Sequence, residues 1–374
     1  MLPQLSEHLL RIWDDLPLER RRPERLGYLG MRTDIADGYA TWLAFADWDS
    51  TPLLLVQIPR HAAVAARLDH AWKTLHWLHR TAAQTVGTSL LRPVFWGAVA
   101  DGRALVTTAP TGEPLTDRNG LAARRITEMG DWLIQLAAAT RLPHDKAPVL
   151  RDLESEMARV VERFALKPAE SAALERWIAI WDAGTPGSRV DLFAAHGNLH
   201  RRNVWCDEHQ LTIINWEQSR AAAFPLHDLL FFALAYLFPP TRRAPLADFV
   251  RALEMAYLED GPYAAVVRRT IARYCAALGV SPGSVEAHLG LMLARQAERE
   301  YEELQAAANA GYLSLLPEGT SRPRRTYQAA IKDQVWINLL RTFIRARPPA
   351  ARPIPSRIRV ADTLPQQARG EMGT

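Results

Sequence analysis

Hydrophobic and polar positions alternate in short runs over the first 110 residues, and alternation of this kind is typical of strands. The predicted strands cover residues 25–30, 39–46, 52–58, 91–98 and 103–108. Between the third and fourth runs the period changes to that of a helix, at residues 61–80, with Val64, Leu68, Ala71, Leu75 and Leu78 on one stripe. This order predicts a small antiparallel sheet that carries one helix.

From about residue 119 the pattern becomes mostly helical. Predicted helices cover residues 120–141, 153–183, 227–238, 244–258, 263–278, 283–309 and 325–345, with a strand-like segment at 211–215. The chain therefore divides into an N-terminal helical extension (1–24), a β-rich lobe (25–110) and a helical lobe (111–346). A Pro- and Arg-rich stretch at 347–374 has little periodicity, and we expect it to be a mobile tail.

Composition narrows the class of protein. A hydrophobic fraction of 48% and a charged fraction of 23% are ordinary for a soluble globular protein of 374 residues. No run approaches the ~20 apolar residues of a membrane span, and the longest, 229–238, is expected to be a buried helix. Two cysteines form no disulfide framework, which favours the cytoplasm. The net charge of +4, without a basic stripe, speaks against nucleic acid.

The most informative segment reads His-Gly-Asn-Leu-His-Arg-Arg-Asn at residues 196–203, followed by Ile-Ile-Asn-Trp-Glu at 213–217. This pair resembles the catalytic loop and metal-binding strand of aminoglycoside phosphotransferases and choline kinases. The resemblance implies an α+β, bilobal, protein-kinase-like fold, with a small antiparallel-sheet N-lobe plus one helix and a large, mainly helical C-lobe. It also implies that the connector at 109–115 is the hinge, beside which the adenine ring of ATP lies in that family.

The two carboxylates of the resembled pattern are missing. His196 and Asn203 match the family in type and spacing, but Asn198 stands where the catalytic Asp is expected, and an amide accepts no proton at neutral pH. Asn215 stands where the metal-binding Asp is expected, and Mg²⁺ prefers anionic oxygen ligands. The Asp that braces the catalytic loop in the family corresponds to Asp228.

Two charged positions of the N-lobe are neutral as well. Gln57 occupies the place of the phosphate-binding lysine on the third strand. Ala71 occupies the place of the glutamate that pairs with that lysine, while Asp69 lies roughly 200° around the helix and is a poor substitute. Lys, Glu, Asp and Asp of the family pattern thus become Gln, Ala, Asn and Asn. Loss of the catalytic base alone lowers the rate by a factor of ~10²–10⁴.

The residues left in the cleft define the candidate site. Asn203, Asn215 and Glu217 are the candidate metal ligands, for a site weaker than that of an active kinase. Arg201 and Arg202, at positions that are commonly Pro and Gly in the family, are candidate contacts for an anion without a metal. The alternative for both arginines is that they point into solvent.

These residues lead to three hypotheses. The first is a cytoplasmic pseudokinase that binds ATP, another nucleotide or another small anionic ligand, or that holds a protein partner in a biosynthetic or regulatory complex. The second is a slow ATP-dependent phosphotransferase, acting on a sugar, an amino alcohol or a peptide Ser/Thr with weakly held Mg²⁺. The third is a structural subunit whose cleft is closed by side chains.

Overall fold

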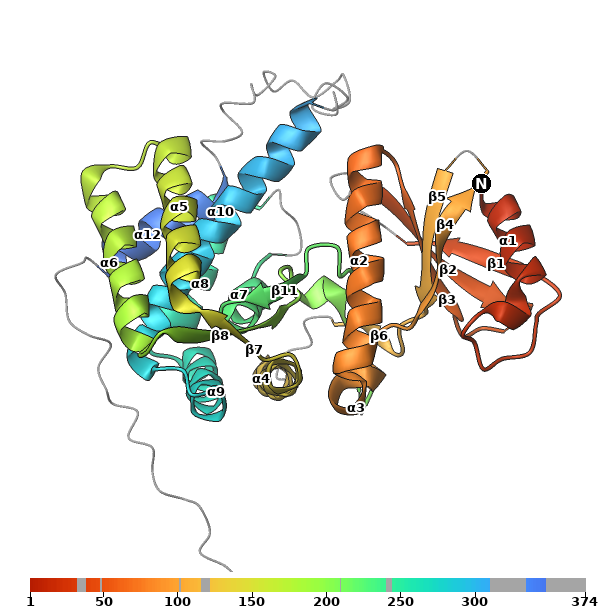
Figure 1. The fold of residues 1–374 in the computed structure, drawn as a ribbon, viewed down its shortest axis with the longest axis horizontal. Coiled ribbons are helices and arrows are strands. Elements are labelled where there is room, and N and C mark those ends of the chain that lie inside the picture. The colour runs from red at the N-terminus through yellow and green to blue at the C-terminus, as the bar shows by residue number, and fades with distance from the viewer. Residues whose placement is uncertain are drawn as a thin grey trace, which may run out of the picture.

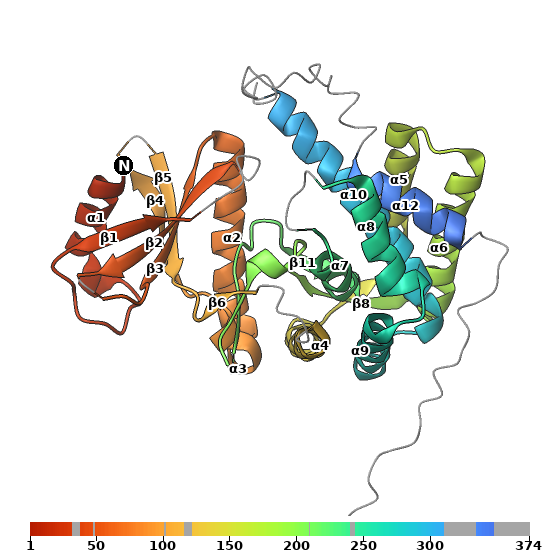
Figure 2. The ribbon, with the colours of Figure 1, turned by 180° about the vertical axis from the view of Figure 1, so that it is seen from behind.

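Two lobes lie along the long axis of the molecule in the computed structural model, with the strands of the first lobe at one end and the helices of the second at the other (Figures 1 and 2). The described residues are 1–31, 38–47, 49–100, 102–115, 122–208, 210–239, 244–309 and 334–347. Residues 348–374 of the tail predicted at 347–374, and the start of the helix predicted at 325–345, lie outside these residues.

The N-lobe is built on a five-stranded antiparallel sheet with the order β1-β2-β3-β5-β4. Its strands are β1 (Leu26–Gly30), β2 (Tyr39–Ala46), β3 (Leu54–Pro59), β4 (Pro93–Val99) and β5 (Gly102–Thr108). All five strands predicted from the alternation are confirmed within a few residues. Side chains alternate across β3, so Leu54 and Val56 lie on one face of the sheet and Gln57 lies on the other.

Each face of this sheet is covered by a helix. Helix α1 (Leu2–Arg11), which is followed by the turn η1 (Trp13–Asp15), packs its buried Leu5 and Leu9 into the same cluster as Leu54 and Val56. Helix α2 (Ala62–Thr81) packs against β3, β4 and β5 from the other side (Figure 1). The predicted inward stripe of α2, from Val64 to Leu78, is buried as expected.

The connector between the lobes takes part in a second, smaller sheet. Strand β6 (Glu113–Pro114) pairs with β9 (Val204–Cys206), which pairs in turn with β10 (Leu211–Ile213). Before the connector, α3 (Ala83–Val86) and η3 (Gly87–Ser89) follow α2, and a bridge joins Leu90 to Ile213. The segment that carries the candidate site is therefore attached to the end of the N-lobe.

The C-lobe is mainly helical, with a three-stranded sheet of order β11-β8-β7. Its elements are α4 (Ala122–Ala139), β7 (Leu142–Asp145), α5 (Lys146–Phe164), α6 (Pro168–Gly184), β8 (Arg189–Ala195), η4 (Arg201–Asn203), β11 (Arg220–Ala223), α7 (His227–Tyr236), α8 (Leu246–Leu253), η5 (Glu254–Leu258), α9 (Pro262–Leu278), η6 (Pro282–Ser284), α10 (Val285–Asn309) and α12 (Val335–Ala346). Together the two lobes confirm the predicted α+β, bilobal, kinase-like class.

Helix α7 explains the longest apolar run of the sequence. All residues from Asp228 to Tyr236 are buried, so the helix is surrounded by the C-lobe and is apolar on every side. Among the residues that the structure describes, no helix is long and apolar enough to cross a membrane.

The prediction of one helix over residues 153–183 is wrong. The structure has two helices there, α5 and α6, because Ala165 adopts a left-handed conformation with φ of 45° and ends α5. Pro168 then begins α6 at a position where its missing N–H costs nothing. Helical periodicity continues across the break because both helices bury one face in the same core.

Candidate functional site

The candidate site lies where β8 ends and the small sheet begins. Strand β8 leads into the His196 loop, and η4 then places Asn203 at the start of β9. The antiparallel pairing of β9 with β10 returns the chain beside this point, where the Ile214 N–H donates to the Asn203 carbonyl at 3.0 Å. Asn215 comes next and has a left-handed φ of 66°, which asparagine tolerates better than most residues.

Three amide side chains form one continuous hydrogen-bonded relay in the cleft. Gln57 Nε2 on β3 donates to Asn215 Oδ1 at 3.0 Å. Asn215 Nδ2 donates to Asn203 Oδ1 at 2.8 Å. Asn203 Nδ2 donates to the backbone carbonyl of Asn198 at 2.9 Å. Four positions at which the sequence predicted ligand or catalytic contacts are therefore brought together, and they bind one another.

The relay does not suit Mg²⁺. The side-chain oxygens of Asn203 and Asn215 each accept a hydrogen bond from a neighbouring amide, and neither residue carries a negative charge. Mg²⁺ demands an octahedral set of oxygen ligands and is usually held by at least one carboxylate. Within the described part of the chain, no group of three or more His, Cys, Asp or Glu side chains is arranged to hold a metal ion. The donor set present therefore fits a neutral hydrogen-bonded junction.

Asp228 braces the loop, as the sequence predicted. Its carboxylate accepts hydrogen bonds from the backbone N–H groups of His196 at 2.5 Å and Gly197 at 3.0 Å. Burial raises the pKa of Asp228 to about 6, although the two backbone donors oppose this rise. The carboxylate fixes the turn that presents Asn198.

His196 holds the loop from inside. Its Nε2 donates to the Ile214 carbonyl at 2.8 Å, and its Nδ1 accepts from the Asn198 N–H at 3.2 Å. The side chain is fully buried, and burial lowers the pKa of His196 to about 4, so the imidazole is neutral at pH 7. Both ring nitrogens are used in structural bonds, so His196 positions the loop and has no free nitrogen with which to act as a base.

Arg299, on α10, lies beside Asn198, the position at which the resembled pattern has its catalytic Asp. Its guanidinium donates to the Gly197 carbonyl at 2.5 Å and lies 3.5 Å from Asn198 Oδ1. The same side chain is 3.7 Å from the carboxylate of Glu303. A cation beside position 198 would stabilise the charged form of a carboxylate there and so weaken that carboxylate as a general base.

The two candidate anion-binding arginines differ in surroundings. Arg201 is half-buried, and its guanidinium donates to the Phe238 carbonyl at 3.0 Å, which turns it toward the end of α7. Arg202 is exposed. Their contact with an anion stays a prediction.

Residues at the edge of the cleft tie the lobes together. Glu217 is buried, and its Oε1 accepts from the Tyr39 hydroxyl of β2 at 3.3 Å. His70 of α2 is 2.7 Å from the Ser219 carbonyl in the C-lobe. Ala71, on the same helix, is buried and leaves no charge at the glutamate position.

Asp69 is indeed no substitute for the missing glutamate. Its carboxylate pairs with Lys73 at 2.7 Å and accepts from the Trp96 indole at 2.8 Å. The Asp69 carboxylate is thus already held by Lys73 and Trp96.

Sequence reasoning missed Arg299, Tyr39 and His70. Arg299 lies about a hundred residues after the loop that it contacts, in a long helix whose pattern marks it only as one charged residue among many. The contact of Tyr39 with Glu217 and that of His70 with Ser219 depend on how the two lobes meet. The charge of Arg299 was no usable signal, because α10 carries several other charged residues.

Known proteins resemble this chain in structure and not in sequence. No known family model matches the sequence, and no curated protein matches it either. Similar solved structures include a thermostable mutant of aminoglycoside phosphotransferase APH(4)-Ia in complex with ADP and hygromycin B. That chain is 12% identical, the match covers 91% of this chain and 98% of that one, and the TM-score is 0.49.

Two further similar structures are phosphotransferases. Spectinomycin phosphotransferase APH(9)-Ia, in complex with ADP and spectinomycin, is 10% identical over 91% of this chain and 98% of that one, with a TM-score of 0.42. Aminoglycoside phosphotransferase APH(3'')-Id from Streptomyces rimosus is 16% identical over 76% of this chain and 96% of that one, with a TM-score of 0.44. These are structures that the chain is similar to, and what the cleft does is judged from its own residues.

Proposed function

We propose that this protein is a pseudokinase, which acts by binding and not by phosphoryl transfer. One observation carries the proposal: the amide relay from Gln57 through Asn215 and Asn203 to Asn198. An active kinase holds its metal and nucleotide phosphates with charged side chains at such positions. Here the charges are absent, and the amides that replace them satisfy one another.

The ligand that best fits the cleft is a nucleotide or another small anion bound without Mg²⁺. Support comes from two guanidinium groups near the loop, that of Arg299 beside Asn198 and that of the exposed Arg202 close by in sequence. Guanidinium groups bind phosphates and carboxylates directly, with no need for a bridging metal. Candidate contacts are Gln57, Arg201 and Arg202.

A second candidate function is that of a scaffold for a protein partner. The hydrogen bonds that join the lobes, Tyr39 to Glu217 and Gln57 to Asn215, favour it because they hold a fixed relative position of the lobes without a ligand. A fixed surface is what a partner needs, since binding then requires less ordering.

Thermal stability separates these alternatives. The purified full chain would be heated with ATP, ADP or GTP, each with Mg²⁺ and with EDTA, because a ligand of the native state raises the melting temperature. We expect a rise that is equal with and without Mg²⁺. A rise that requires Mg²⁺ would contradict the pseudokinase proposal and favour the slow phosphotransferase. No rise at millimolar nucleotide would favour the scaffold.

A restoration experiment tests the chemistry directly. Asn198→Asp combined with Asn215→Asp returns both carboxylates, yet we expect no sustained ATP turnover. The new Asp at 198 would lie beside Arg299, which stabilises its charged form and weakens it as a base, and Gln57 would still lack the lysine charge. Steady turnover by the double variant, measured as ADP release with an inactive heat-treated control, would overturn this reasoning.

A further inference from the structure

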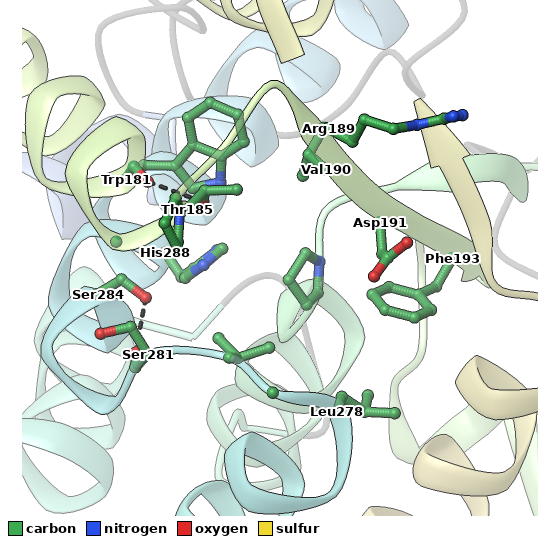
Figure 3. A pocket seen from close by; sticks show the side chains of 15 residues that line it. Trp181, Thr185, Arg189, Val190, Asp191, Phe193, Leu278, Ser281, Ser284 and His288 are labelled. Atoms are coloured by element: carbon green, nitrogen blue, oxygen red, sulfur yellow. Dashed lines mark hydrogen bonds between the residues drawn. The ribbon is translucent and has the colours of Figure 1, made fainter. Parts of the chain in front are cut away.

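A cavity of about 230 Å³ lies in the C-lobe, away from the amide relay. It is partly open to solvent and is lined by the end of α6, strand β8, and the turn that joins α9 to α10 (Figure 3). Its wall combines apolar side chains, among them Trp181, Phe193 and Leu278, with an equal or larger share of polar groups. An apolar cavity of about 150 Å³ is large enough to bind benzene, so this one has room for a single substituted ring.

One buried polar side chain faces this space. His288 is only 6% exposed, and its imidazole points into the cavity (Figure 3). Within the described residues, its ring nitrogens make no hydrogen bond. Burial, with a smaller effect of Arg295, lowers the pKa of His288 to about 3, so at pH 7 the ring is neutral and has one donor and one acceptor. The ring nitrogens are therefore available to a ligand that enters the cavity, which would take the place of solvent there.

The other polar groups of the wall do not offer a free charge. Asp191 pairs with Arg141, and the charged end of Arg189 extends away from the cavity (Figure 3) and donates to the Pro143 carbonyl at 3.2 Å. Ser284 Oγ donates to the Ser281 carbonyl at 2.7 Å, so its hydrogen is used and its oxygen remains an acceptor. A charged ligand would lose its hydration here without gaining a counter-charge.

We propose that this cavity is a second binding site, for a small neutral molecule with one aromatic ring system and one hydroxyl or N–H donor. The donor would bind the acceptor nitrogen of His288, and the ring would pack against Trp181 and Phe193. Phenol and indole represent this class in size and chemistry. The site does not depend on the proposed function of the cleft.

The cavity is connected to the candidate site through the chain itself. Phe193 lies on β8 three residues before His196, and Pro225 lies three residues before Asp228. His196 and Asp228 are the two side chains that hold the loop, so a ligand between Phe193 and Pro225 would stabilise both segments that present it.

Titration calorimetry on the full chain tests the proposal with three probes: phenol, toluene and benzoate. Toluene has the ring without the donor, and benzoate has the ring with a charge. We expect phenol to bind about fivefold more tightly than toluene, from one neutral hydrogen bond of about 1 kcal/mol. We expect no binding of benzoate. Equal binding of phenol and benzoate, or no saturable heat with millimolar phenol, would overturn the proposal.

Variants locate the binding. His288→Phe removes the ring nitrogens and should weaken phenol about fivefold while leaving toluene little changed. The matched control is His76→Phe, a half-buried histidine on α2 in the other lobe, which should leave phenol binding unchanged. If His288→Phe does not fold, Ser281→Phe serves instead, because this half-buried position lines the cavity and a large side chain there should abolish binding. Unchanged phenol affinity in a folded variant at either position places the binding elsewhere and refutes the site.

Discussion

Replacing Asn215 by Asp removes one hydrogen bond of the relay. Asn215 Nδ2 donates to Asn203 Oδ1 across 2.8 Å, and in Asn215→Asp a carboxylate oxygen would face that amide oxygen. Asn203 is not free to turn its amide around, because its Nδ2 already donates to the Asn198 carbonyl. Two acceptors would therefore meet in a buried place, and a charge would be added.

The expected loss of stability follows from these contacts. One hydrogen bond is lost, and a buried acceptor is left without a donor, which costs about 1–3 kcal/mol and more for a charged group. The bond from Gln57 Nε2 at 3.0 Å would remain and would strengthen somewhat on a carboxylate. We expect the free energy of unfolding to fall by about 2 kcal/mol.

A divalent cation should reverse part of this loss in the variant alone. Two facing oxygens, one of them anionic, form a partial ligand set that Mg²⁺ or Mn²⁺ would bridge. At a concentration of 100 times the dissociation constant, such binding adds about 2.7 kcal/mol. The wild type has no such pair of oxygens and should not respond.

Urea denaturation midpoints measured with EDTA and with Mg²⁺ test the reasoning. Asn338→Asp is the matched control, because the Asn338 amide donates to the Gln334 carbonyl on α12, far from the cleft in the chain. Its midpoint should not respond to Mg²⁺. If Asn215→Asp were as stable as the wild type in EDTA, or if Mg²⁺ stabilised the wild type equally, the neutral relay would not be the structure that holds the cleft.

Three further predictions concern the supports of the site, each read from denaturation midpoints of the variant beside the wild type. Glu156→Gln should lower the free energy of unfolding by about 3–5 kcal/mol, because it leaves the buried Arg295, now paired at 2.8 Å, without its carboxylate; a loss below 1 kcal/mol would contradict this. Gly197→Ala should cost about 2 kcal/mol or more, since φ is +78° and a Cβ would lie 2.3 Å from the Gln218 carbonyl oxygen, whereas an unchanged midpoint would disprove the close approach. Burial lowers the pKa of His196 to about 4 from 6.5, so below pH 6.5 the unfolded chain binds a proton that the folded chain does not, and the free energy of unfolding falls by about 3 kcal/mol between pH 6.5 and pH 4. His196→Asn should remove this part of the pH dependence of stability. An identical pH profile in the variant would show that the imidazole is not kept neutral.

Most of the N-lobe could be predicted from the sequence because the burial of each of its strands is visible in the hydrophobic pattern of that strand. Alternation in β2 and β3 and the buried stripe of α2 are local signals, and each matched the structure to within a few residues. The short strands β7 and β11 were not predicted. Their residues are mostly exposed, so no hydrophobic period marks them, and they exist because they pair with β8.

The candidate site was predictable as a set of residues but not as an arrangement. The spacing of Asn198, Asn203 and Asn215 placed them in one cleft, and the brace by Asp228 followed from the resemblance. The sequence could not predict the hydrogen bonds among Asn203, Asn215 and Gln57. An amide side chain both donates and accepts hydrogen bonds, so its partners are known only from the structure. The contact of Arg299 with the His196 loop was not predictable for a different reason: it depends on how α10 packs against that loop.

The direct bonds between the lobes set an opening equilibrium for the cleft. Separating β2 and β3 from the C-lobe breaks Gln57–Asn215 and Tyr39–Glu217, at about 1 kcal/mol each for neutral or singly charged pairs. With the third contact, of His70 with Ser219, these bonds leave fewer than about one molecule in thirty open at any moment. A ligand that enters by separating the lobes would therefore bind with an apparent dissociation constant more than about thirtyfold above its intrinsic value. Loss of Tyr39 by substitution would make the same cleft more receptive without removing any of the candidate contacts to the ligand.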